Sequence, residues 1–196
     1  MATTSSEPGP QPSVSRHEPQ YDLDTLIKAS PDELKEIFAQ LPAPSPKEMD
    51  GEYASEIPAY ANVKDRAALA ALGFGDWLGK SYTPTAYKHH QGHGLNQWRQ
   101  PDGSVRRVLR FAWDIEPSAR DGRSSLVMKY AAFDNWGRTI TLIDEVRAAA
   151  KGLYLCTFAT AVDVPGFSVN GEGGFFILHG PQKPFVGPDD IVAEVD

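Results

Sequence analysis

The pattern of hydrophobic and polar positions changes near residue 75. Beyond that point, short alternating segments are separated by turn residues, which is typical of a small antiparallel β-barrel. The pattern predicts strands near 77–83, 94–100, 105–115, 124–133, 138–147, 152–162 and 174–179. Turn-forming residues predict hairpins at 101–104 and 134–137 and a loop at 171–174. The predicted fold is therefore mainly β, an antiparallel β-barrel preceded by α-helices.

Alternation within each strand assigns its side chains to an inner or an outer face. In 105–115 the inner face carries Val105, Leu109, Phe111, Trp113 and Ile115, and the outer face carries Arg106, Arg110 and Asp114. In 124–133 the inner face carries Leu126, Met128 and Tyr130. The inner residues are mostly large and apolar, so the interior of the predicted barrel is an apolar lumen.

The segment before the barrel combines a polar tail with a helix. Residues 1–20 hold almost no large apolar group and are predicted to be disordered, since they cannot bury enough surface to offset their ordering entropy. Ser30 to Glu33 form a capping box, which predicts an amphipathic helix over 31–41. We expect this helix to cover one end of the barrel, the alternative being a partner protein. Strand 152–162 is bulky on both faces, which indicates that the lumen meets one face and the N-terminal helices the other.

This pattern divides the chain into a tail at 1–20, a helical segment with its linker at 21–46, a barrel domain at 47–182 and a C-terminal tail at 183–196. A second, Ala-rich helix is predicted over 63–72, and a short strand near 49–53.

Composition and charge narrow the function classes. The net charge of −7 argues against a nucleic-acid partner, which would require a basic face. One cysteine allows no intrachain disulfide, and no apolar run approaches the length of a membrane span. The N-terminus has no apolar signal region, so the expected location is the cytoplasm. A homo-oligomer remains open.

Asp144 is the sharpest chemical signal in the sequence. It shares a strand face with Leu142 and Val146, and a carboxylate on an apolar face is costly unless it has a partner. Acid and base catalysts are often built in this way. The alternative is a structural role near the strand end, with Arg147 as the ion-pair partner. A register slip at a bulge would turn Asp144 outward and Arg147 inward.

The remaining candidates carry weaker signals. His89 and His93 are four residues apart, but the neighbouring glycines favour a polar turn over a metal site. His179 lies on the last predicted strand. Three roles are open to it: a core residue, a proton carrier in the pocket or an axial haem ligand. Cys156 is expected to be an inert core thiol. No phosphate-binding or nucleophile-elbow motif is present, so chemistry without a dissociable cofactor is expected.

The segment Gly75-Asp76-Trp77-Leu78-Gly79 resembles the first strand of calycin-type barrels, in which lipocalins carry Gly-x-Trp. Nitrobindin-like proteins and an uncharacterised bacterial family carry the longer Gly-x-Trp-x-Gly form. The resemblance covers roughly residues 50–180 and implies a lumen for a hydrophobic small molecule, with the tryptophan packed across the closed end. The nitrobindin likeness would make His179 the haem-ligand candidate, although the residues around it do not match.

These observations favour a barrel that binds a lipid, a polyketide or a terpenoid-like molecule in its lumen. The residues expected to line the site are Asn96, Phe111, Trp113, Met128, Leu142 and His179. The alternative is a cofactor-independent isomerase, cyclase or lyase, with Asp144 as proton carrier and Tyr130 or Arg147 stabilising negative charge. In a third hypothesis the protein is an interaction module that uses helix 31–41. No metal is expected.

Overall fold

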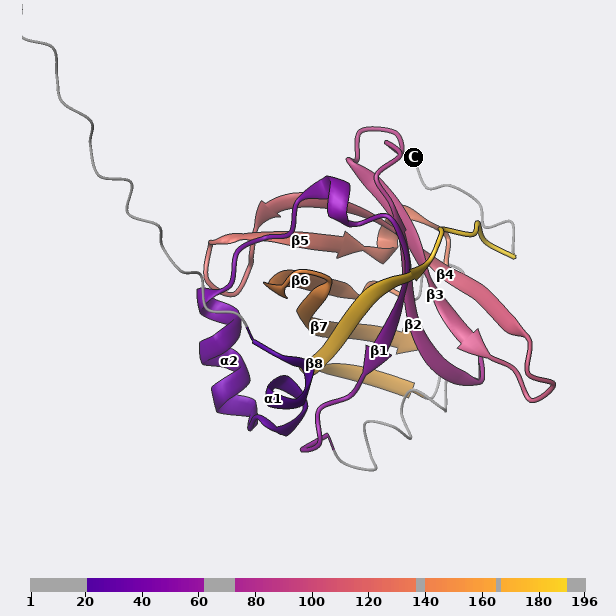
Figure 1. Ribbon diagram of the computed structural model, residues 1–196. Helices are drawn as coiled ribbons and strands as arrows, with labels where there is room; N and C mark the ends of the chain where they lie inside the picture. The colour runs from indigo at the N-terminus through magenta and orange to yellow at the C-terminus, as the bar shows by residue number, and fades with distance from the viewer. Residues whose placement is uncertain (1–20, 62–72, 137–139, 165–166, 190–196) are drawn as a thin grey trace, which may run out of the picture.

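The protein folds into a closed antiparallel barrel whose eight strands follow one another in chain order, β1 to β8. The computed structural model describes residues 21–61, 73–136, 140–164 and 167–189 (Figure 1). The strands are β1 (Gly51–Glu56), β2 (Asp76–Thr83), β3 (Gly92–Arg99), β4 (Val105–Pro117), β5 (Ser124–Lys129), β6 (Ile143–Ala150), β7 (Leu153–Val164) and β8 (Phe167–Lys183). Pairing of β8 with β1 over Ile177 to Lys183 closes the barrel.

Two helices, α1 (Leu23–Lys28) and α2 (Pro31–Gln40), lie against one side of the barrel (Figure 1). The predicted capping box starts α2, because Ser30 and Glu33 satisfy each other's backbone N–H groups. The apolar side chains of the helices form an outer core with the outward faces of β6, β7 and β8, in which Phe38 packs edge-on against Phe175. The helices therefore cover the side wall of the barrel and not one of its ends.

A second core lies inside the barrel, around the lumen. Its members come from every strand and include Tyr53, Trp98, Phe111, Met128 and Cys156. Strand β7 contributes to both cores, since Tyr154 and Cys156 face the lumen while Leu153 and Leu155 face the helices. The predicted double coverage of this strand is confirmed.

The strand predictions over residues 77–115 and at 152–162 agree with the structure, whereas the bounds of those at 124–133, 138–147 and 174–179 need correction. Strand β5 ends at Lys129, a 3-10 turn (η2, Tyr130–Ala132) follows, and β6 begins only at Ile143. Asn135 donates from its side-chain amide to the carbonyls of Arg110 and Tyr130, which folds this connection onto β4 instead of allowing a tight hairpin at 134–137.

The predicted loop at 171–174 is also wrong. Strands β7 and β8 remain paired from Leu153 opposite His179 to Val164 opposite Phe167, so this stretch belongs to β8. Its glycines permit close approach, because a Cβ on Gly173 would lie 1.6 Å from the carbonyl oxygen of Phe158. The predicted tail at 1–20 and helix at 63–72 lie outside the described residues.

Candidate functional site

Four polar side chains meet inside the apolar lumen: Lys80 from β2, Asn96 from β3, Tyr130 from η2 and Asp144 from β6. We call them the lumenal polar cluster. The Lys80 ammonium lies 2.9 Å from Asp144 Oδ2, and the two side chains are 3% and 4% exposed. Lys80 also donates to Asn96 Oδ1 at 2.9 Å and to the Tyr130 hydroxyl at 2.5 Å. A buried ion pair is thus held by two neutral hydrogen-bonding partners.

A bulge in β2 places Lys80 inside the barrel. Trp77 and Lys80 are three residues apart and would face opposite sides of a regular strand. The β2–β3 register shifts between Trp77 and Gly79, so both side chains face the lumen. Gly79 has φ +142°, and a Cβ there would lie 2.0 Å from the Tyr53 carbonyl oxygen. The second glycine of the Gly-x-Trp-x-Gly segment is what allows this bulge against β1.

A second irregularity positions Asn96. Leu109 in β4 has φ +58°, and the β3–β4 register shifts between Gly94 and Asn96. The Leu109 carbonyl accepts a hydrogen bond from Asn96 Nδ2 at 3.2 Å. The same shift turns Val105 to the outer side and Val108 into the lumenal core, which corrects the predicted inner position of Val105.

Aromatic rings surround the ammonium group of Lys80. Its nitrogen lies between 5.2 and 5.5 Å from the ring centres of Trp77, Phe111, Tyr130 and Phe176. Such contacts stabilise a desolvated cation. Burial, and next the negative charge of Asp144, raise the pKa of Tyr130 well above its usual value. The Tyr130 hydroxyl is therefore protonated at neutral pH and acts as a donor.

One carboxylate oxygen of Asp144 receives no hydrogen bond from the other members of the cluster. The Tyr130 hydroxyl accepts from Lys80 and Asn96 and donates to Asp144 Oδ2 at 3.2 Å. Asn96 Oδ1 accepts from Lys80 and from Trp77 Nε1 at 3.1 Å, while Nδ2 donates twice. Asp144 Oδ1 is buried and has no hydrogen-bond partner among the described residues. A buried acceptor of this kind is costly unless a ligand or water satisfies it.

Apolar side chains that are only partly buried pack against the lumenal core. They include Trp77 next to the cluster, Leu142 just before β6, and Phe158, which pairs across strands with Asp144. Trp77 packs edge-on against Phe176 with ring centres 5.4 Å apart. The half-buried aromatic and aliphatic groups next to Asp144 are the environment that an apolar molecule needs.

Most of the predicted site residues lie in or beside the lumen. Asn96, Phe111, Trp113, Met128, Tyr130 and Asp144 are all buried, and Leu142 packs against them from a partly buried position. The inward orientation of Phe111, Trp113, Met128 and Asp144 follows from strand alternation, which the sequence shows directly.

The predicted role of Arg147 in the lumen is wrong, because its side chain faces the outer side of β6. Its guanidinium is fully buried beneath α2, pairs with both carboxylate oxygens of Asp121 and donates to the carbonyl of Phe38. This pairing lowers the pKa of Asp121 to about 2. Arg147 therefore joins a turn and a helix to the barrel wall, and Lys80 takes the place beside Asp144 that was predicted for it.

The predicted position of His179 in the binding site is also wrong. It shares its side of β8 with Phe175 and Ile177, which belong to the core beneath the helices, so it lies outside the lumen. Its imidazole Nδ1 lies 3.2 Å from the Gln182 side-chain amide. The alternation pattern could not reveal this, because both faces of β8 are apolar.

The sequence alone favours a solvated Lys80, with a role toward an acidic ligand group as the alternative, and does not place it beside Asp144; it also misses Trp77 as a member of the site. Trp77 was expected to pack across the closed end, whereas its indole N–H is bonded to the cluster. Gly79 could have indicated that Lys80 faces the lumen, since a glycine inside a strand often marks a bulge that changes the alternation of side chains.

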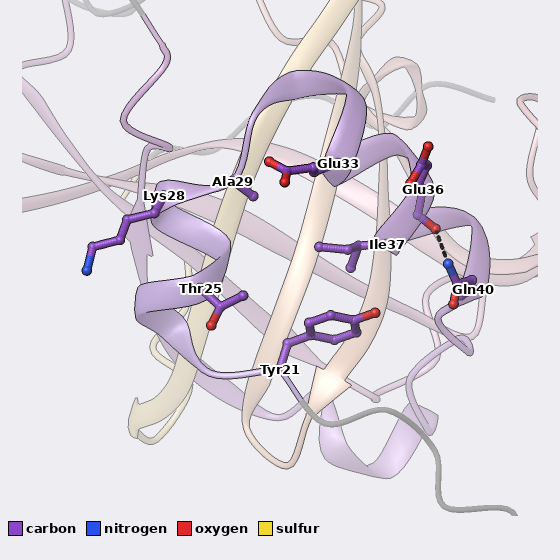
Figure 2. A pocket seen from close by; sticks show the side chains of 8 residues that line it. All are labelled: Tyr21, Thr25, Lys28, Ala29, Glu33, Glu36, Ile37 and Gln40. Atoms are coloured by element: carbon purple, nitrogen blue, oxygen red, sulfur yellow. Dashed lines mark hydrogen bonds between the residues drawn. The ribbon is translucent and has the colours of Figure 1, made fainter.

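A hollow of about 400 Å³ lies outside the barrel between α1 and α2 (Figure 2). Its lining includes the apolar groups of Tyr21 and Ile37 and the charged side chains of Lys28, Glu33 and Glu36 (Figure 2). Two of its three charged side chains have partners, since Lys28 pairs with Asp24 and Glu33 caps α2. Across the described residues no group of three or more His, Cys, Asp or Glu side chains is placed to hold a metal ion. The lumen is therefore the stronger candidate site.

Comparison with known proteins supports the fold alone. No family model matches the chain, and no curated protein sequence matches it. A crystal structure of a protein from Thermomonospora curvata is similar, with a TM-score of 0.51 and 19% identity over 78% of this chain and 88% of that one. Within the described part of the chain, no helix has the length and apolar character needed to cross a bilayer. The chain is an eight-stranded antiparallel barrel with its polar cluster enclosed in an apolar lumen.

Proposed function

We propose that this barrel binds a mostly apolar small molecule in its lumen, next to the lumenal polar cluster. The observation that carries the proposal is the unpartnered Asp144 Oδ1, which is buried among aromatic side chains. Binding sites for small molecules combine apolar walls with a few convergent polar groups, and the cluster with Trp77 and Phe158 provides both. Closed eight-stranded barrels of calycin type are large enough to hold one such ligand.

The chemistry of the walls favours a lipid, a polyketide or a terpenoid-like ligand. Aromatic and aliphatic groups surround the Lys80–Asp144 ion pair, so most of the ligand surface would be buried against carbon. The buried Cys156 thiol and the absence of a second cysteine fit a reducing compartment, and we place the protein in the cytoplasm on that ground.

The lumen also supports a second candidate, a cofactor-independent isomerase, cyclase or lyase. Asp144 Oδ1 is free to accept a proton, while Lys80 and Tyr130 on Oδ2 hold the carboxylate in place. In such a reaction the carboxylate would remove a proton from the bound molecule and return it at another position. The third hypothesis, a docking helix at 31–41, loses its basis, because Leu34 and Phe38 of α2 are buried against the barrel.

Native mass spectrometry of the purified protein tests the binding proposal first. We expect a co-purifying species of a few hundred daltons, or binding of the neutral dye Nile red with a blue-shifted emission. Leu142 and Ile143 provide a matched pair of variants, since Leu142 packs toward the lumen while the adjacent Ile143 is 44% exposed. Leu142→Glu should abolish binding, and Ile143→Glu should leave it unchanged. Equal effects of the two variants, with both folded by circular dichroism, would place the ligand elsewhere.

The enzyme candidate needs a different measurement. A co-purified molecule incubated with fresh protein should change its chromatographic retention if it is a substrate, and Asp144→Asn should stop that change. Unaltered turnover in this variant would remove Asp144 from the mechanism.

A further inference from the structure

We infer that the lumenal ligand is an uncharged molecule that presents a hydroxyl group, as in an alcohol, a phenol or an enol, to Asp144 Oδ1. This inference rests on the proposed binding function and narrows it to a chemical class. It excludes carboxylates, which are the most common polar end group of small lipids. The donors and acceptors that the cluster has already used restrict the ligand to this class.

The donors of the cluster are used up by the protein itself. An ammonium group has three N–H donors, and Lys80 spends them on Asn96, Tyr130 and Asp144. The amide of Asn96 makes both of its donations, and the Tyr130 hydroxyl has only one proton, which points to Asp144. None of these groups can bind an anionic oxygen without giving up a bond that it already makes.

The position that remains in the cluster is an acceptor. Asp144 Oδ1 has no partner among the described residues, and a carboxylate oxygen can only accept. A ligand that meets it must bring an O–H or N–H group. A carboxylate or an ether would leave Oδ1 buried without a partner, and a carboxylate would also place a second negative charge beside it.

The charge balance of the lumen points to a neutral ligand. Lys80 and Asp144 neutralise each other at 2.9 Å, and both are almost completely buried. A further charge of either sign would enter an apolar, low-dielectric space without a counter-ion, which is costly. A primary amine would be protonated at neutral pH, and its positive charge would be repelled by the Lys80 ammonium beside Asp144. The remaining unpartnered polar atom of the described lumen, Trp98 Nε1, is a neutral donor that suits a ligand carbonyl or ether oxygen.

The test uses two matched ligand series on the wild-type protein at pH 7.5, measured by isothermal titration calorimetry. One series is 1-decanol, decyl methyl ether, decanoic acid and decylamine. The other is 2-naphthol, 2-methoxynaphthalene and 2-naphthoic acid. We expect the alcohol or phenol to bind at least tenfold more tightly than its ether, because a hydrogen bond to a buried charged group is worth about 1.5–3 kcal/mol. We expect the acids and the amine to bind more weakly than the alcohols.

A paired variant identifies the group that discriminates. Lys80→Met/Asp144→Leu removes both charges together, and the ratio between alcohol and ether affinity should fall to about one. The control, Lys129→Met/Glu116→Leu, removes a partly exposed ion pair on the outer face and should keep the wild-type ratio. The wild-type series is decisive by itself if the lumenal variant does not fold.

The outcomes separate the two proposals. Tightest binding by an acid, an ether or the amine would overturn this inference while leaving lumenal binding intact. No binding by any member of either series, together with no co-purifying species and no Nile red binding, would overturn the proposed function and this inference with it.

Discussion

Removing one partner of the Lys80–Asp144 pair should destabilise the fold far more than removing both. At the Nζ–Oδ2 separation of 2.9 Å, the attraction is about 6 kcal/mol with an effective dielectric constant of about 20. Desolvation of the two charges offsets much of this, so the intact pair contributes little net stability. Lys80→Met or Asp144→Leu alone leaves the other charge buried without compensation. We expect each single variant to lose about 3–5 kcal/mol of unfolding free energy.

The double variant Lys80→Met/Asp144→Leu should lose only about 0–2 kcal/mol, because no charge remains unpaired and the new side chains are apolar. The double-mutant cycle then gives a coupling energy of several kcal/mol. Lys151 is exposed, so Lys151→Met is a control for the loss of one lysine charge and should stay within about 0.5 kcal/mol of the wild type.

Equilibrium unfolding in urea, followed by the fluorescence of the four tryptophans, measures these differences. Repeating the cycle in 1 M NaCl should leave the coupling almost unchanged, since salt screens exposed pairs much more than buried ones. Losses below about 1 kcal/mol in both single variants would refute the reasoning. So would a double variant whose loss equals the sum of the two single losses.

Three other predictions test the frame of the site. Gly79→Ala should lower the unfolding free energy in urea by several kcal/mol or prevent folding, because its Cβ would lie 2.0 Å from the Tyr53 carbonyl oxygen. The control Gly103→Ala, with φ +85° and no atom within 4 Å of the added Cβ, should lower it by only about 1 kcal/mol. The lowered pKa of Asp121 gives the wild type about 1 kcal/mol of stability that is fully present above about pH 4 and lost as the pH falls through about 2. The unfolding free energy of the wild type in urea should therefore fall toward that of Asp121→Asn over that range. Burial raises the pKa of the Cys156 thiol, so a thiol reagent such as Ellman's reagent should label it only after unfolding. Rapid labelling of the native protein would contradict the burial of Cys156.

The inward positions in the middle of the strands could be predicted because strand alternation is a local property. Phe111, Trp113, Met128 and Asp144 all face the lumen as their spacing indicates. The helix start at Ser30 was equally readable, since a capping box involves only neighbouring residues.

The errors fall where the strands stop being regular. The alternation rule fails at the bulges beside Gly79 and Leu109, which decide that Lys80 lies inside and Val105 outside. It also fails where both faces of a strand are apolar, as at His179, because the pattern then cannot distinguish the lumen from the helix-covered side. Arg147 was predicted to pair with Asp144 or to stabilise charge in the lumen. Its actual partner, Asp121, lies in a turn outside the barrel, and strand alternation gives no information about such a contact.

By itself the sequence determined the class of the fold, the face that carries Asp144 and the capped helix, because each of these depends on residues close together along the chain. Only the tertiary structure decided which cation meets Asp144 and which of its oxygens is left without a partner. Those facts depend on closure of the barrel, which brings β2, β3 and β6 around one lumen and holds Lys80 against a carboxylate far along the chain. The hydrogen bonds of a buried cluster can be counted only when all its members have been brought together.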